Sequence, residues 1–214
     1  MRPTTLLLCR HGESEWNAQH RVQGQAPEAG GLTAEGRRQA ALLARRLRDF
    51  HIDALYTSDL RRSMETAEIV AATLGLTPVA DPLWREFDMG RWQGLTVEEV
   101  RSRWPVQQIR EMDLPRGDTG ETWAGFIERV RRAVDALVAR HPGQTVAVVT
   151  HGGNVRASLL LTQHQDDPSA RYNQPIPNTS ITAIHLTDGR AWSSLVADAA
   201  HLDGHLTATN DDGR

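Results

Sequence analysis

The residues with side chains suited to catalysis lie at the ends of predicted strands. Arg10 and His11 directly follow the apolar run 6–9, and His151 directly follows the apolar run 145–150. Both histidines precede a glycine, which lets backbone N–H groups come close to a ligand. In an open α/β sheet, ligands bind where the carboxyl ends of parallel strands meet the amino termini of helices. We therefore expect the two histidines to face one pocket.

A third predicted strand end adds arginines to this set. The strand predicted over 52–57 runs into a helix predicted over 60–74, and Arg61 and Arg62 lie in the first turn of that helix. Guanidinium groups form bidentate, charge-assisted hydrogen bonds with phosphate oxygens. Neutral imidazole beside a bound phosphoryl group is a competent nucleophile. The sequence thus predicts a site for a dianionic phosphoryl group, which still needs an acid to protonate the departing oxygen.

Composition excludes several other classes of function. The chain has 214 residues, 39% of them hydrophobic and 24% charged, which is typical of an ordinary globular protein. Its net charge of -3 gives no electrostatic reason to expect nucleic acid or an anionic membrane as a partner. The sequence contains no lysine, which excludes a Schiff-base lysine and a Walker-type phosphate loop.

The one cysteine and the first apolar run indicate the environment of the protein. Cys9 can form no internal disulfide, and its place in an apolar strand predicts a buried structural thiol rather than a reactive one. The run 6–9 is far shorter than a signal-peptide core or a membrane span. We expect a cytoplasmic protein with no membrane partner.

Strands and helices alternate along the chain, and this order must position the candidate site. Strands are predicted at 6–9, 52–57, 78–80, 145–150, 180–186 and 191–196, the last two joined by a turn at 188–189. Helices are predicted at 14–20, after Thr33, at 60–74, from Thr96 to before Pro105, at 121–140 and at 153–161. We predict an α/β fold, a three-layer α/β/α sandwich with a mostly parallel central sheet. A single domain over 1–203 with a flexible tail over 204–214 is expected.

Six segments, in order, resemble the histidine phosphatase superfamily, the phosphoglycerate mutase-like group, in its small phosphatase branch. The segments are LLLCRHGESEWN at 6–17, LTAEGRRQA at 32–40, YTSDLRRSMETAEI at 56–69, REFDMGRWQGLT at 85–96, GETWAGFIERV at 120–130 and VTHGGNVR at 149–156. Together they span most of the chain. The resemblance implies an enzyme that needs neither a metal nor a cofactor and acts on a small phosphorylated substrate.

The resemblance also implies a role for individual residues. His11 would attack phosphorus and carry the phosphohistidine intermediate, while Arg10, Arg62 and His151 would bind the phosphoryl oxygens. Glu86 would protonate the leaving group and then activate the attacking water. Further positions that match the phosphate or substrate pocket of the family are Asn17, Gln23, Gly24 and Gly152.

Hydrolysis is favoured over the mutase reaction by three departures from the mutase pattern. Mutases of the family typically have Asn where this chain has Gly153, and a longer, often lysine-bearing insertion where this chain has the short, lysine-free segment 87–119. We predict a phosphomonoester hydrolase. A phosphoglycerate mutase-type transferase and a non-catalytic phospholigand-binding protein are the alternatives. The substrate and the oligomeric state, a homodimer among the options, stay open.

Two histidines and two tryptophans outside the assigned roles could take part either in the site or in packing. His201 and His205 have a metal-like spacing, but their place near the predicted tail favours a non-metal interpretation. Trp92 and Trp123 lie near the motifs and could contact substrate, and core packing explains them equally well.

Overall fold

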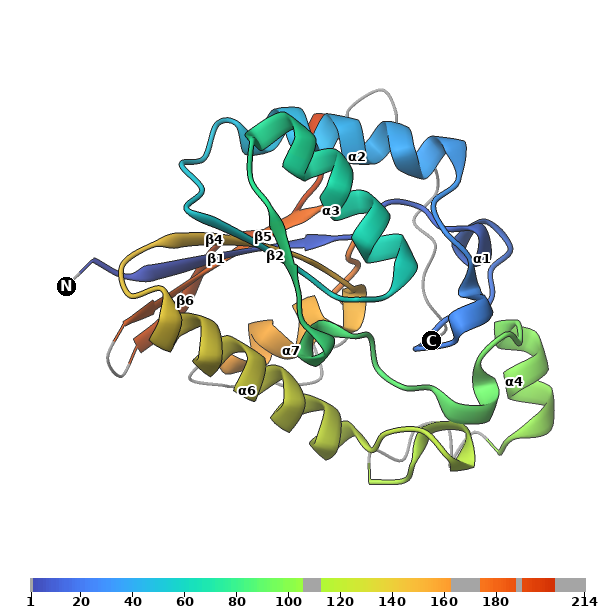
Figure 1. The fold of residues 1–214 in the computed structure, drawn as a ribbon. Helices are drawn as coiled ribbons and strands as arrows, with labels where there is room; N and C mark the ends of the chain where they lie inside the picture. Colours follow the sequence, from blue (N-terminus) through green and yellow to red (C-terminus); the bar gives the residue numbers. More distant parts are fainter. Residues whose placement is uncertain (1, 106–112, 163–173, 188–189, 203–214) are drawn as a thin grey trace.

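A six-stranded sheet forms the centre of the molecule in a computed structural model that describes residues 2–105, 113–162, 174–187 and 190–202 (Figure 1). In spatial order the strands are β3 (Pro78–Ala80), β2 (Ala54–Thr57), β4 (Thr145–Thr150), β1 (Thr4–Arg10), β5 (Ile181–Thr187) and β6 (Arg190–Asp198). The first four are parallel, whereas β5 is antiparallel to β1 and β6 is antiparallel to β5. The predicted mostly parallel sheet is confirmed.

Helices cover both faces of this sheet (Figure 1). One layer contains α2 (Ala34–Leu47) and α3 (Arg61–Leu74), and the other contains α6 (Trp123–Arg140) and α7 (Gly152–Leu161). The short helices α1 (Glu15–Ala18) and α4 (Val97–Arg103) lie beyond the carboxyl ends of the parallel strands. Single 3-10 turns are η1 (Pro27–Ala29), η2 (Pro82–Trp84), η3 (Gly90–Trp92), η4 (Arg116–Asp118) and η5 (Ala200–Leu202). This is the predicted three-layer α/β/α sandwich.

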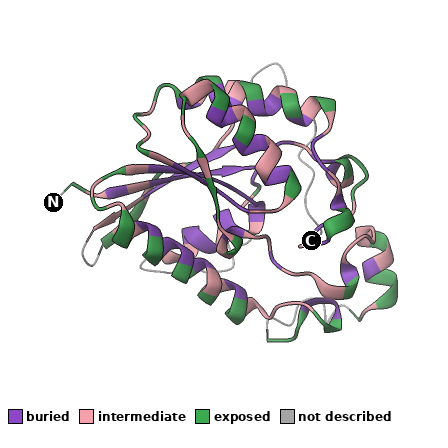
Figure 2. Cartoon of the chain, viewed as in Figure 1, coloured by how far each residue is buried: buried purple, intermediate pink, exposed green. Residues whose placement is uncertain are grey.

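Alternation along β1 divides the core into two layers, because successive side chains of a strand point to opposite faces. Leu6 and Leu8 pack in the layer under α6 and α7. Leu7 and Cys9 pack in the layer under α2 and α3. Figure 2 shows the buried residues concentrated along the strands and the inner sides of the helices. Burial raises the pKa of the Cys9 thiol to about 12, so the prediction of a structural thiol is confirmed.

The amino end of α3 differs from the hydrophobic pattern that the sequence suggests. Periodicity favours Met64 and Ile69 as buried residues, but both are only half-buried, and Ser63 and Thr66 are buried in their place. The reason is that the polar pair faces the strand ends. Thr66 Oγ1 accepts a hydrogen bond from the Gly12 N–H at 3.1 Å. Polar residues therefore occupy the buried face of α3 where it borders the candidate site.

The predicted helix caps at Thr33 and Thr96 are confirmed, and Thr96 forms the expected capping box with Glu99. Among the helices of the described residues, none has both the length and the apolar composition that crossing a membrane requires. The predicted turn at 188–189, the predicted tail 204–214 and the stretch 106–112 lie outside the described residues. The domain limits 1–203 stay a prediction.

Candidate active site

Two adjacent strands bring the two histidines together. Arg10 of β1 pairs with Thr150 of β4, so His11 and His151, one position further along, are neighbours at the carboxyl edge of the sheet. The His11 N–H donates to the Thr150 carbonyl at 2.9 Å. The two imidazole rings meet edge to face, with their centroids 5.1 Å apart. The expected juxtaposition of these strand ends is present.

The first turn of α3 delivers Arg62 to the same place. Its Nε donates a hydrogen bond to His11 Nε2 at 3.2 Å, and one terminal nitrogen donates to the Gly24 carbonyl at 2.8 Å. Gly24 has a φ of 49°, in the left-handed region, and a Cβ there would overlap the Gln93 side chain. Of the two consecutive arginines, Arg62 is buried at the site, whereas Arg61 is exposed and pairs with Glu65.

The hydrogen bonds of His11 fix its tautomer. Its Nδ1 lies 2.7 Å from the Gly12 carbonyl oxygen, which can only accept. Its Nε2 receives the Arg62 N–H, which can only donate. The proton must therefore be on Nδ1, and Nε2 presents a lone pair. Burial, together with the positive charges of Arg62 and Arg10, holds the pKa of His11 well below its ordinary value. His11 is thus a neutral imidazole with a basic nitrogen toward Arg62.

His151 is also held neutral. Its pKa is lowered well below the ordinary value by burial, and then by the charges around it, Arg62 foremost. Its Nε2 lies 3.2 Å from Ser63 Oγ, while its Nδ1 is buried without a hydrogen-bond partner among the described residues. An unsatisfied buried nitrogen costs about 1–3 kcal/mol, which is typical of groups kept for a ligand or a reaction.

Arg10 directly precedes His11, and Asn17 is linked to the His11 carbonyl through Asn178, whose Nδ2 donates to both. Arg10 is 2% exposed and donates to the Ile176 carbonyl at 2.6 Å. Asn17 is 1% exposed, and its Oδ1 accepts from the Ser14 backbone N–H at 3.2 Å as part of the capping box of α1. Ser14 Oγ also lies 2.7 Å from Gln23 Oε1, which joins the α1 turn to the 22–24 loop. Ser14, Asn17 and Gln23 therefore form one buried polar network.

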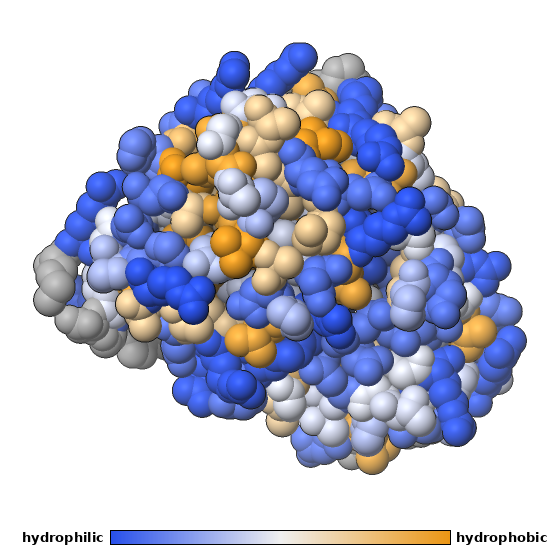
Figure 3. Space-filling view, in the orientation of Figure 1, coloured by the Kyte–Doolittle hydropathy of each residue, from blue (hydrophilic) through white to orange (hydrophobic). Residues whose placement is uncertain are grey.

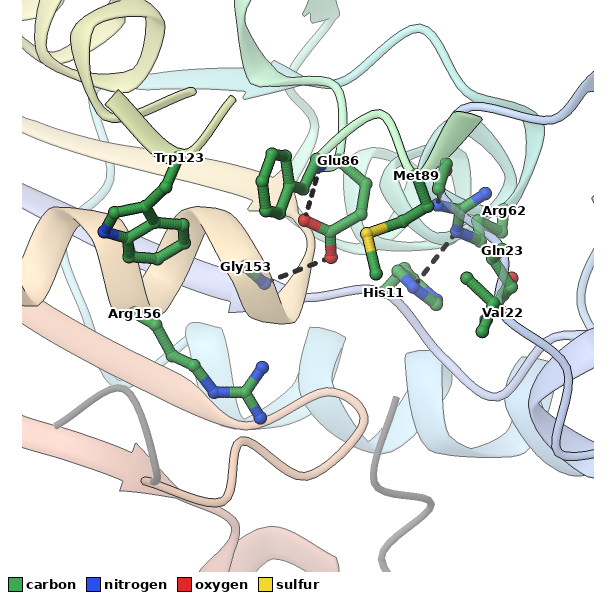
Figure 4. Close-up of a pocket in the computed structure, with 11 residues that line it drawn as sticks. His11, Val22, Gln23, Arg62, Glu86, Met89, Trp123, Gly153 and Arg156 are labelled. Carbon is green, nitrogen blue, oxygen red and sulfur yellow. Dashed lines mark hydrogen bonds between the residues drawn. The ribbon is translucent and has the colours of Figure 1, made fainter. Parts of the chain in front are cut away.

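Glu86 reaches the pocket from an irregular segment after η2. Its Oε2 accepts the Gly153 N–H of α7 at 3.0 Å, and its Oε1 accepts the Phe87 N–H at 2.8 Å (Figure 4). Gly153 is the second residue of α7, so the carboxylate stands at the positive end of that helix. The structure places the predicted acid and the predicted nucleophile on the walls of one pocket.

The pocket has a polar end and an apolar wall. The residues that line it are His11, Val22, Gln23, Gly24, Arg62, Glu86, Phe87, Met89, Trp123, Gly153 and Arg156. Of the predicted residues, Gly152 precedes Gly153 at the start of α7, and it is buried, as are Arg10, Asn17 and His151. The face of the molecule seen in Figure 3 mixes hydrophobic and hydrophilic side chains.

Sequence reasoning missed part of this wall. Arg156 lies in the quoted motif at 149–156, but no role was predicted for it, and Figure 4 shows its guanidinium beside the pocket. Trp123 lines the pocket, whereas Trp92 packs in a buried cluster with Val22 and Val100. The sequence could have predicted Arg156 as a site residue, because it lies four residues after Gly152 and thus on the same face of α7.

Metal ligands are not grouped in the described part of the chain. No set of three His, Cys, Asp or Glu side chains there could hold a metal ion. His201 is on η5, with Nε2 3.3 Å from Thr179 Oγ1, and its predicted partner His205 lies outside the described residues.

The fold and the site define a class of α/β proteins with neutral histidines and buried arginines at the carboxyl edge of a parallel sheet. The family model of the histidine phosphatase superfamily (branch 1) matches residues 6–199. The chain therefore belongs to this superfamily of enzymes, as its motifs predicted.

Three similar proteins indicate the range of functions within the family. Phosphoglycerate mutase-like protein 4 of Arabidopsis thaliana is 35% identical over 92% of this chain and 86% of its own length. Phosphoserine phosphatase 1 of Hydrogenobacter thermophilus is 34% identical over 86% of this chain and 88% of its own. A mycobacterial glucosyl-3-phosphoglycerate phosphatase, solved with VO3, superposes with a TM-score of 0.81. It is 28% identical, and the match covers 91% of this chain and 99% of that one.

Proposed function

We propose that this chain hydrolyses phosphomonoesters of a small metabolite through a phosphohistidine intermediate on His11. The observation that carries the proposal is the His11 imidazole, which is neutral and has its Nε2 lone pair toward Arg62 in a pocket that Glu86 also lines. A neutral imidazole with a fixed tautomer can attack phosphorus without first losing a proton. The substrate is a small phosphorylated molecule that enters this pocket.

In the first half-reaction, His11 Nε2 forms a bond to phosphorus while the bond from phosphorus to the leaving oxygen breaks. Arg62 then turns its N–H from Nε2 to a phosphoryl oxygen, and Arg10 and His151 bind the other oxygens. Glu86, in its protonated form, gives a proton to the leaving oxygen. General-acid catalysis of this kind contributes about 10²- to 10⁴-fold to rate. The products are an alcohol and the phosphohistidine.

In the second half-reaction, water takes the place of the departed alcohol. Glu86, now a carboxylate, accepts a proton from the water as its oxygen bonds to phosphorus and the bond to His11 Nε2 breaks. Inorganic phosphate leaves, and the proton taken by Glu86 restores the acid for the next cycle. The groups that held the phosphoryl oxygens in the first step are the same in the second.

The names of two similar proteins support hydrolysis, since one is a phosphoserine phosphatase and the other a glucosyl-3-phosphoglycerate phosphatase. Gly153 and the short segment 87–119 point the same way. The mutase-like relative favours phosphoglycerate mutase-type transfer as the second candidate. That reaction is tested by interconversion of 3-phosphoglycerate and 2-phosphoglycerate in the presence of the bisphosphate.

The proposal is tested with p-nitrophenyl phosphate in the presence of a chelator, for the wild type and for His11→Ala. We expect turnover by the wild type that chelator does not reduce, and loss of turnover in the variant. Labelled phosphate should be trapped on the wild type in an acid-labile form. Equal activity of the two proteins would refute the phosphatase mechanism. Ligand binding without turnover would instead favour a non-catalytic phospholigand-binding protein.

A further inference from the structure

The segment 83–86, which leads to Glu86, is bound by side chains from other elements. Arg129 of α6 donates to three of its carbonyls, namely Leu83 at 2.9 Å, Arg85 at 2.7 Å and Glu86 at 3.1 Å. The guanidinium is planar and its donors are fixed relative to one another, so it orients all three peptide groups together. The main chain of Glu86 is therefore held by one side chain of the helix layer.

Glu121 binds the main chain just after this segment and also binds Arg129. It accepts two hydrogen bonds from Arg129, both at 2.7 Å, in a bidentate pair. Its Oε2 also accepts the backbone N–H of Asp88 at 2.9 Å. The ion pair is largely shielded, with 15% and 24% of the two side chains exposed. We call Arg129 and Glu121 the clamp, because together they bind the main chain before and after Glu86.

The clamp also contacts the apolar wall of the pocket. The Arg129 guanidinium lies 5.0 Å from the centroid of the Phe126 ring, and Phe126 stacks on Phe87 at 4.6 Å. Gln25 Nε2 adds a hydrogen bond to the Glu86 carbonyl at 2.9 Å. With its main chain held, Glu86 can move only by rotation about its side-chain bonds. The hydrogen bond from the Gly153 N–H to its carboxylate restricts that rotation.

We propose that Arg129 and Glu121 are positioning residues that place the carboxyl group of Glu86 for proton transfer. This inference rests on the proposed function, since it assigns the clamp a role in the acid step of that reaction. Arg129 is not among the residues that line the pocket, and it acts through Glu86, whose carbonyl it binds. Lysine at position 129 has no planar fork and cannot orient three carbonyls at once, so it should restore the function only in part.

Two aryl esters test the proposal. Phenyl phosphate releases a more basic oxygen than p-nitrophenyl phosphate, so its cleavage depends more on a proton donor. We expect Arg129→Leu to lower kcat/KM for phenyl phosphate about 10- to 100-fold more than for p-nitrophenyl phosphate, within the range of general-acid effects. Glu86→Gln should show the same selective loss, and Arg129→Lys a smaller one. The matched control is Arg131→Leu on the same helix, whose arginine is 53% exposed and pairs with Glu128.

A double-mutant comparison separates positioning from stability. If Arg129 acts through Glu86, then adding Arg129→Leu to Glu86→Gln should change the ratio of the kcat/KM values for the two esters only slightly. The proposal would be overturned if Arg129→Leu lowered kcat/KM equally for both esters. It would also be overturned if the selective loss for phenyl phosphate were as large in the Glu86→Gln background as in the wild type. If Arg129→Leu does not fold by circular dichroism, Glu121→Gln is measured in its place with the same criteria. A wild type that cleaves neither ester would instead refute the proposed function itself.

Discussion

Residue chemistry at the site depends on which charges are present before substrate enters. Arg10 and Arg62 stand beside His11 and His151, and the pKa values of both histidines lie well below the ordinary value. The positive charge of the site therefore resides on the guanidinium groups, and the imidazoles stay available as a nucleophile and as a hydrogen-bonding group. A dianionic phosphoryl group then meets two fixed cations without having to displace a proton from the nucleophile.

A further cation, Arg156, stands on the pocket wall. Its Nε donates to the Gln174 carbonyl at 3.0 Å, which anchors the side chain. A leaving group that carries a carboxylate, as phosphoserine does, would gain a charge-assisted contact there. We expect Arg156→Leu to lower kcat/KM for phosphoserine about tenfold relative to p-nitrophenyl phosphate, because hydrogen bonds to charged groups contribute about 1.5–3 kcal/mol. The comparison is made by steady-state kinetics with both substrates, and an unchanged ratio would contradict a contact with the leaving group.

At the scale of elements, the start of α7 and the position of Glu86 are linked. A Cβ at Gly153 would overlap Glu86 Oε1 and lie 3.3 Å from Phe126 Cζ. The Glu86 carboxylate is the end of a flexible side chain, so it can move aside at little cost to the fold. A glycine at this position therefore leaves room for the carboxylate to accept the α7 N–H.

We predict that Gly153→Ala leaves the melting temperature within about 2 °C of the wild type, as expected for a change below about 0.5 kcal/mol. Its kcat for phenyl phosphate should fall about tenfold or more, because Glu86, the proposed proton donor, is displaced. Gly125→Ala is the control, since a Cβ there meets only Thr122 Oγ1 at 3.2 Å. A variant with full activity would show that the Glu86 contact with α7 is dispensable, and a large loss of stability would show that the overlap is not relieved by Glu86 alone.

Elements with strong local signals were predictable from the sequence, and long-range contacts were not. The buried strands β1 and β4, and the caps at Thr33 and Thr96, have local patterns that determine them. At α3, hydrophobic periodicity alone does not predict that Ser63 and Thr66 are buried, because their burial depends on the strand ends that they border. Three candidate residues inside the motifs, His11, Arg62 and Glu86, line one pocket, and their roles stay a prediction. Arg129 of α6 binds the segment 83–86 across 43 to 46 residues, and Glu121 binds the Asp88 N–H across 33 residues. No local pattern encodes such contacts.

At the scale of the whole molecule, the two neutral histidines couple stability to pH. Their folded pKa values lie below the unfolded value of about 6.5, so the unfolded chain binds more protons as pH falls through that value. Stability should be independent of these groups above about pH 7 and should decrease as pH falls from about 6.5 toward the lower folded pKa values. Each group contributes at most about 1.4 kcal/mol per pH unit in this window.

The measurement is urea unfolding of the wild type, His11→Gln and His51→Gln at intervals between pH 8.0 and 5.5. His11→Gln is expected to be less sensitive to acid than the wild type, because it lacks one of the two groups that gain protons on unfolding. His51→Gln should follow the wild type, since the His51 side chain is 86% exposed and its burial changes little. Parallel curves for all three proteins would contradict the coupling. An increase in wild-type stability toward pH 5.5 would show that the charged imidazole is favoured in the fold, so the site would no longer offer a neutral nucleophile.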